Sequence, residues 1–165
     1  MKTIYLAGGC FWGTQRFFDQ FRGVVSTEVG YANGKTDHPS YEQVRYENTG
    51  HAETVKIQFD DTVISVEKLL EYYFLAIDPL AVNHQGEDFG TQYRTGIYYE
   101  DPSLLPVIER VCAVKEQELG QKLAVEVSPL ENFWRAEEYH QDYLVKNPGG
   151  YCHIPTRLFH LEEKD

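Results

Sequence analysis

Cysteine is scarce in this chain of 165 residues. Its three cysteines are Cys10, Cys112 and Cys152. An odd number without close spacing argues against a disulfide scaffold and against a Cys-x-x-Cys metal site. This usage favours a reducing compartment, in which thiols act by turning over.

Long apolar runs and an excess of basic residues are also missing. No stretch approaches the roughly 18 apolar residues of a membrane helix, and the run over residues 3–7 is too short for a secretory signal core. We therefore expect a cytoplasmic protein without a targeting segment. Fifteen basic against 26 acidic residues give a formal net charge of −11, which argues against a nucleic-acid or anionic-membrane partner.

Repeats, low-complexity tracts and linkers are absent from the sequence as well. A chain of this length can bury one sizeable core. We therefore expect a single domain over residues 1–165, acting as a monomer, with an irregular tail over about residues 146–165.

The most informative stretch that is present is Gly-Gly-Cys-Phe-Trp-Gly at residues 8–13. A predicted strand over residues 2–7 precedes it, and a predicted helix over residues 12–20 follows it. Cys10 would then lie near free backbone N–H groups and the positive end of a helix dipole, which favours the thiolate. The alternative is a buried core cysteine beside the aromatic rings of Phe11 and Trp12.

The remaining pattern predicts strands that alternate irregularly with helices. Strands are expected over residues 24–31, 54–59, 94–99 and 124–127, and helices over residues 40–44, 66–76, 104–120 and 136–144. Residues 83–93 form a long polar loop, a kind of segment that often carries function. The pattern indicates an α+β fold, a two-layer α/β sandwich with a mixed or antiparallel sheet.

Five segments, in order, resemble the signatures of the A-type peptide methionine sulfoxide reductases. They are the stretch around Cys10, Pro39-Ser40-Tyr41, Gly50-His51-Ala52-Glu53, residues 88–94 (Asp-Phe-Gly-Thr-Gln-Tyr-Arg) and residues 147–152 (Asn-Pro-Gly-Gly-Tyr-Cys). One departure is Gln15, where many members carry Glu. The resemblance implies a ferredoxin-like plait core with a long irregular C-terminal tail.

The resemblance also implies a role for each matched residue. Cys10 would attack the sulfur of methionine-S-sulfoxide, free or in proteins, while Glu53 protonates the sulfoxide oxygen. Tyr41 and Tyr93 would hydrogen-bond that oxygen. Substrate binding would fall to three further residues: Phe11, Trp12 and Asp88.

The end of the reaction is implied in the same way. Cys10 would become a sulfenic acid, and Cys152 in the tail would resolve it as a disulfide. No cysteine follows Cys152, so thioredoxin would reduce the disulfide directly, without a metal or organic cofactor.

Each residue taken alone has a plainer interpretation. Glu53 would be a solvated charge, Asp88 a turn residue, Cys112 core filler, and Tyr41 and Tyr93 packing residues among 12 tyrosines. Two other functions also remain open. One is a thiol peroxidase or a cysteine hydrolase, for which His51 is the candidate base; the other is a non-catalytic binding or redox-sensing module.

Overall fold

The computed structural model describes residues 1–161, and the last four residues of the expected tail lie outside this range. The strands and α-helices are β1 (Lys2–Gly8), α1 (Phe11–Asp19), β2 (Val24–Ala32), α2 (Tyr41–Tyr46), β3 (Ala52–Phe59), α3 (Val66–Ala76), β4 (His84–Gln85), β5 (Asp88–Phe89), β6 (Thr95–Tyr99), α4 (Leu105–Leu119), β7 (Glu126–Pro129), β8 (Phe133–Arg135) and α5 (Tyr143–Lys146). Four 3-10 turns complete the list: η1 (Thr91–Tyr93), η2 (Pro102–Leu104), η3 (Glu138–His140) and η4 (Thr156–His160).

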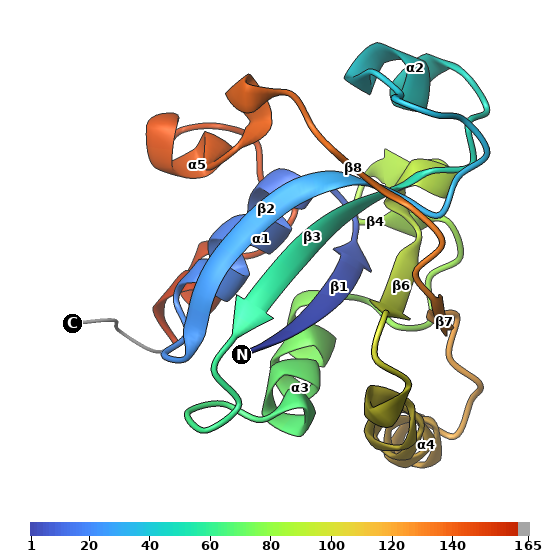
Figure 1. Ribbon diagram of the computed structural model, residues 1–165, viewed down its shortest axis with the longest axis vertical. Helices are drawn as coiled ribbons and strands as arrows, with labels where there is room; N and C mark the ends of the chain where they lie inside the picture. The colour runs from blue at the N-terminus through green and yellow to red at the C-terminus, as the bar shows by residue number, and fades with distance from the viewer. Residues whose placement is uncertain (162–165) are drawn as a thin grey trace.

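Within residues 1–161, a six-stranded sheet in the order β7-β6-β1-β3-β2-β8 forms one layer. Its neighbours pair antiparallel except for β6 and β7, which are parallel. Helices α1 and α3 lie against one face of the sheet (Figure 1). The α/β sandwich with a mixed sheet is therefore confirmed, while the finer ferredoxin-like plait remains a prediction.

The core lies between the sheet and these helices. Alternating residues of β1 and β3, such as Ile4, Leu6, Val55 and Ile57, pack against the aromatic side chains of α1. On the opposite face of the sheet, Tyr5 and Tyr98 belong to a smaller cluster. The only methionine, Met1, is 72% exposed, so the core is built from aromatic and branched side chains.

Local sequence signals explain where several elements begin and end. Ser65 accepts a hydrogen bond from the backbone of Lys68 and caps α3, as the sequence predicts. Ser40 caps α2 in the same way, and Gln43 closes a reciprocal capping box. Gly120 ends α4 in the left-handed conformation that glycine adopts readily.

The helix predicted over residues 136–144 is wrong. The structure has β8 before it, then η3 and the short helix α5. Gln141 is the physical reason, because its side chain bonds both the N–H and the C=O of Val29 in β2. Asp142 then adopts a φ of +54°, which no α-helix interior permits.

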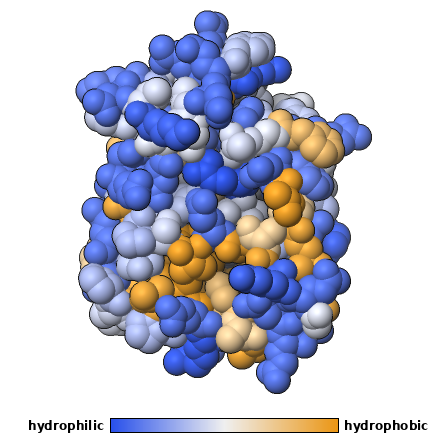
Figure 2. Space-filling view, turned by 90° about the vertical axis from the view of Figure 1, so that its right-hand side faces the viewer, coloured by the Kyte–Doolittle hydropathy of each residue, from blue (hydrophilic) through white to orange (hydrophobic). Residues whose placement is uncertain are grey.

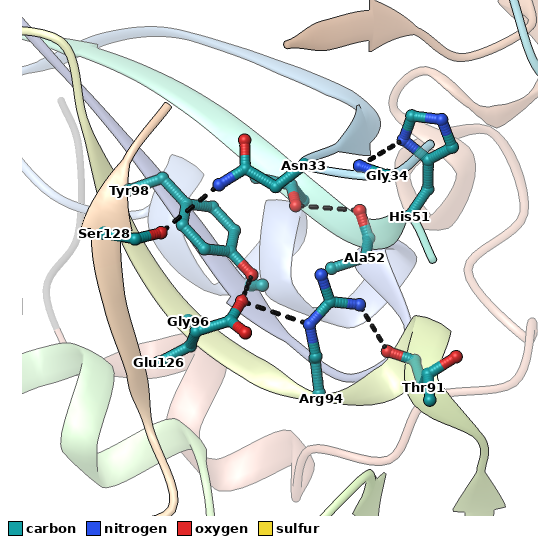
Figure 3. Close-up of polar contacts among 12 residues, drawn as sticks. Asn33, Gly34, His51, Ala52, Thr91, Arg94, Gly96, Tyr98, Glu126 and Ser128 are labelled. Carbon is teal, nitrogen blue, oxygen red and sulfur yellow. Dashed lines mark hydrogen bonds and ion pairs between the residues drawn. The ribbon is translucent and has the colours of Figure 1, made fainter. Parts of the chain in front are cut away.

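The polar segment over residues 83–93 is more ordered than the predicted loop. It contains the two-stranded hairpin β4–β5 and the turn η1. Arg94 fixes η1 to the sheet, since its guanidinium bonds the Thr91 carbonyl at 3.0 Å and the Glu126 carboxylate at 3.1 Å (Figure 3). Tyr98 donates a further hydrogen bond to the same carboxylate.

The hydropathy of the surface differs between the upper and lower parts of the face shown in Figure 2. Hydrophilic side chains cover the upper part of this face, and apolar side chains gather lower down, at the level of α3 and α4. Over the described residues, no helix is long and apolar enough to cross a membrane.

The hydroxyl of Tyr73 joins α3 to the neighbouring strands β1 and β6, which yields the first prediction. It donates to the Ala7 carbonyl at 2.6 Å and accepts from the Gly96 N–H at 3.1 Å, fully buried. Tyr73→Phe leaves these groups unpaired and should lower the free energy of unfolding by about 1–3 kcal/mol. Urea denaturation measures the loss, with Tyr72→Phe as the control; equal stability of Tyr73→Phe and the native protein would contradict it.

Candidate active site

The glycine turn between β1 and α1 presents Cys10 as the N-cap residue of α1. Gly9 has a φ of +87°, which a side chain would oppose, and a Cβ there would meet Gln85 at 2.7 Å. Cys10 is buried, with 8% of its surface exposed. The turn therefore holds the sulfur at the start of the helix, as the sequence predicts.

Glu53 lies directly beside this turn. One of its carboxyl oxygens accepts a hydrogen bond from the backbone N–H of Phe11 at 3.1 Å, across 42 residues of sequence. This N–H is one of the unpaired donors of the first helical turn. The side chain is 2% exposed, so the interpretation of Glu53 as a solvated charge is wrong.

Burial raises the pKa of both acidic groups at the centre of the site, the Glu53 carboxyl and the Cys10 thiol. Burial raises the pKa of the Glu53 carboxyl to about 8, against the opposing effect of the Phe11 N–H. Burial, and then the nearby Glu53, raise the pKa of the Cys10 thiol well above its usual value, although the Trp12 N–H opposes the shift. The direction of this shift is opposite to the one predicted from the helix terminus, because burial disfavours the thiolate.

Tyr41 and Tyr93 reach the same centre from two different elements. The charge of Glu53 contributes, after burial, to raising the pKa of both hydroxyls, and Cys10 adds to it. Tyr41 begins α2, where its backbone N–H donates to Glu137 at 2.9 Å. Tyr93 is the last residue of η1. Because the pKa of each hydroxyl is raised, both tyrosines are protonated and can donate hydrogen bonds.

Phe11 and Trp12 occupy different environments. The ring of Phe11 is 1% exposed and packs against Tyr31 and His140, with ring centres 5.7 and 5.2 Å apart. The partly buried Trp12 ring stacks on Tyr143 at 3.8 Å, and its indole N–H donates to His140 at 2.9 Å. Trp12 thus offers the more accessible aromatic surface.

Sequence reasoning missed His140 and Tyr143, because both fall in the segment predicted as a helix. His140 is fully buried, and its ring lies 4.5 Å from that of Tyr41. The signal was the run Glu-Tyr-His-Gln-Asp-Tyr at residues 138–143, which is too polar for an amphipathic helix. These residues support both the indole and the tyrosine.

The departure at position 15 has a local explanation. The Gln15 amide N–H donates to the Thr27 side chain at 3.1 Å, while its carbonyl accepts from the Asp142 backbone at 2.9 Å. The side chain is buried and needs one donor and one acceptor, which an amide supplies. Gln15 therefore links α1 to β2 and to the start of α5.

The tail brings Cys152 onto the first turn of α1. A Cβ built on Gly13 would lie 2.7 Å from the Cys152 sulfur, so only glycine leaves room for it there. Tyr151 next to it donates a hydrogen bond to Asp88 at 2.9 Å. The sulfurs of Cys10 and Cys152 remain separate free thiols.

The third thiol and the candidate base stand apart from this chemistry. Cys112 is buried in α4 within the main core, which agrees with its interpretation as core filler. Both ring nitrogens of His51 are engaged, one by the Gly34 N–H and the other by the Thr36 carbonyl. His51 is therefore not available to Cys10 as a hydrolase base would be.

The arrangement defines a class of protein. A buried thiol beside a protonated carboxyl, with a second free thiol against the same helical turn, is the site of a thiol-dependent oxidoreductase. Over residues 1–161, no group of three or more His, Cys, Asp or Glu side chains is placed to hold a metal ion.

Comparison with known proteins identifies the family. Residues 2–164 match the peptide methionine sulfoxide reductase family, and the chain belongs to it. A peptide methionine sulfoxide reductase MsrA of Lachnoclostridium phytofermentans is 55% identical over 158 residues, which cover 96% of this chain and 95% of the relative.

Solved structures agree with this assignment. The reduced form of Mxr1 from Saccharomyces cerevisiae superposes with a TM-score of 0.88 at 37% identity, covering 99% of this chain and 92% of that one. Mxr1 in complex with Trx2 shares the fold, with a TM-score of 0.61 at 24% identity over 86% of this chain and 84% of that one.

Glu53 also makes the stability of the protein depend on pH. Because its pKa is raised from 4.5 to about 8 on folding, the folded state binds the extra proton between these values. The contribution of Glu53 to the free energy of unfolding should therefore be complete below about pH 4.5. It should be lost, by a few kcal/mol, as pH rises through 8. Glu53→Gln should remove this decline.

Urea denaturation of both proteins at pH 5 and pH 9 measures the difference. Glu47→Gln, at an exposed position, is the control and should follow the native protein. Parallel pH curves for Glu53→Gln and the native protein would show that the carboxyl is not protonated in the folded state.

Proposed function

We propose that this protein reduces methionine-S-sulfoxide, free or in proteins, through a sulfenic acid on Cys10. The hydrogen bond that brings Glu53 to the turn carrying Cys10 is the observation that most supports it. A sulfoxide sulfur is a poor electrophile until its oxygen is protonated, so a nucleophile and an acid must act at one point. The preference for the S epimer rests on the family resemblance.

The first step transfers oxygen from the substrate to Cys10. The Cys10 sulfur attacks the sulfoxide sulfur as its S–H bond breaks, and Glu53 donates a proton to the oxygen as the S–O bond of the substrate breaks. The thiol proton restores the Glu53 carboxyl, and the oxygen remains on Cys10 as the hydroxyl of the sulfenic acid. Thiol plus sulfoxide yields sulfenic acid plus thioether, so protons and electrons balance without a cofactor. The raised pKa of Glu53 supports this role because it leaves the carboxyl protonated near neutral pH.

The neighbouring side chains orient the substrate. Tyr41 and Tyr93 donate hydrogen bonds to the sulfoxide oxygen and to the charge that develops on it. Trp12 supplies an apolar wall for the S-methyl group, and Phe11 contributes by packing behind the site. Asp88, paired with Tyr151, helps to hold the rest of the substrate.

Cys152 completes the cycle. Its sulfur attacks the sulfenic sulfur of Cys10, water leaves, and a disulfide forms. A dithiol of thioredoxin then reduces this disulfide through a mixed disulfide. The yeast relative Mxr1 has been solved in complex with Trx2, which supports a thioredoxin as the reductant.

The surroundings follow from the same chemistry. We propose that residues 1–165 act as one catalytic unit, as a monomer in the cytoplasm. Three free thiols support a reducing compartment.

The activity is tested with separated epimers of a methionine sulfoxide peptide and a thioredoxin system. The S epimer should be reduced and the R epimer left intact, and Cys10→Ser should abolish turnover. Cys112→Ser is the matched control and should retain turnover, because Cys112 lies on α4 in the hydrophobic core, away from the site. Failure to reduce the S epimer would overturn the proposed function.

The acid is tested in a single turnover, by following methionine formed per enzyme. Glu53→Gln keeps an acceptor for the Phe11 N–H but cannot supply the proton, so the rate should fall by roughly 10²-fold or more. The native rate should also fall as pH rises through about 8, where Glu53 ionises. An unchanged rate in Glu53→Gln would remove Glu53 from the mechanism.

A further inference from the structure

His153 follows the resolving cysteine and is anchored on the active-site turn. Its Nε2 lies 2.8 Å from the Gly8 carbonyl oxygen. A Cβ built on Gly9 would meet the same nitrogen at 3.0 Å, so the imidazole packs closely on the glycine turn. The tail is thereby fixed beside the turn that carries Cys10.

This contact decides which nitrogen carries the hydrogen. A carbonyl oxygen only accepts hydrogen bonds, so Nε2 must be the donor. In the neutral ring, Nδ1 then bears an unshared electron pair. Within residues 1–161, this buried Nδ1 has no hydrogen-bond partner, and a buried polar atom left unpaired in this way calls for an explanation.

The unpaired nitrogen and the Cys152 sulfur face the same point of α1. A Cβ on Gly13 would lie 2.7 Å from the sulfur and 3.5 Å from Nδ1. In this reduced form the thiol is turned toward the Ile154 carbonyl at 3.4 Å, and the Ile154 N–H donates to the sulfur at 3.3 Å. Proton transfer between the two groups therefore requires the Cys152 side chain to leave Ile154 and turn toward the imidazole.

We propose that His153 is the base that takes the thiol proton of Cys152 in the resolving step, an inference that rests on the proposed function. The S–H bond of Cys152 breaks as its proton moves to Nδ1, and the sulfur attacks the sulfenic sulfur of Cys10. The S–O bond of the sulfenic acid breaks, and the departing hydroxide takes the proton from Nδ1 as water. One thiol and one sulfenic acid give one disulfide and one water, so no other reactant is needed.

The surroundings suit this role. Burial raises the pKa of the Cys152 thiol, so at neutral pH its proton must be removed before attack. Burial lowers the pKa of His153, which keeps the ring neutral and able to accept that proton. The polar groups that act on the ring are the Gly8 carbonyl on the glycine turn and the Asp88 carboxylate on the β4–β5 hairpin; both favour the protonated ring, against burial.

The test compares the native enzyme with His153→Gln. The glutamine amide can replace the Nε2–H donor to Gly8 but offers no basic nitrogen, so the anchor is kept and the base is lost. His160→Gln, in the exposed end of η4, is the matched control. Each reduced protein is mixed with one equivalent of methionine-S-sulfoxide peptide, quenched by thiol alkylation at set times, and analysed by mass spectrometry for methionine, sulfenic acid and disulfide.

The first-turnover yield of methionine should stay within about twofold in every variant. At pH 7, disulfide formation in His153→Gln should be slower by about tenfold or more, as expected when a general base is removed. The deficit should shrink as pH rises, because hydroxide then deprotonates Cys152 directly. His160→Gln should match the native enzyme at every pH.

An unchanged disulfide rate in His153→Gln, or a deficit of the same size at every pH, would overturn the role as base. The native enzyme alone gives an independent measurement, should the variant not fold. Its disulfide rate should be nearly level from pH 7 to 9, whereas unassisted ionisation of Cys152 would raise it about tenfold per pH unit. Absence of methionine in the first turnover would instead count against the proposed function.

Discussion

The hydrogen bond from the Phe11 N–H to the Glu53 carboxyl is the contact on which the site depends. It exists because the sheet register places Ala7 opposite Thr54, so the residue before Thr54 lies next to the turn that follows Ala7. The helix terminus supplies a donor that has no partner within the helix, and the strand supplies the acceptor. One contact between a strand end and a helix start thus joins the carboxyl to the backbone beside the thiol.

Burial, against the effect of this hydrogen bond, sets the charge state of the site. A carboxyl so deeply buried holds its proton, and burial likewise discourages ionisation of Cys10. The resting centre is therefore a pair of neutral acids, which avoids the high cost of burying two like charges. Oxygen transfer from a sulfoxide to a thiol conserves protons overall, so this neutral pair needs no exchange with solvent to complete it.

Much of the fold could be predicted from local signals. Residues 66–76 form a helix with the predicted cap at Ser65, and the β-branched runs form strands close to the predicted bounds. The segment after β8 could not be predicted, because distant hydrogen bonds from Gln141 to β2 override the local helical pattern. The proximity of Cys10, Glu53 and Cys152 was predicted from the order of the motifs, since spacing alone cannot place residues so far apart in the sequence.

The charge of Cys10 shows a different limit of sequence reasoning. A strand–glycine–helix pattern predicts the helix terminus correctly, but it cannot report how deeply the packed structure buries the sulfur. Burial, which only the packed structure reveals, decided the pKa direction. The partners of Trp12, His140 and Tyr143, could not be predicted either, because a histidine and a tyrosine in an irregular segment have no periodic signature.

The position of the single methionine affects how well the protein resists oxidation. An enzyme that repairs oxidised thioethers works among the oxidants that produce them, and its own thioethers are exposed to the same attack. Here the single methionine sits at the solvent-exposed start of the chain, and the interior is filled with phenylalanine, tyrosine and branched aliphatic side chains. Conversion of that one thioether to a polar sulfoxide would leave the packing of the core intact, so oxidation of its own methionine does not inactivate the enzyme.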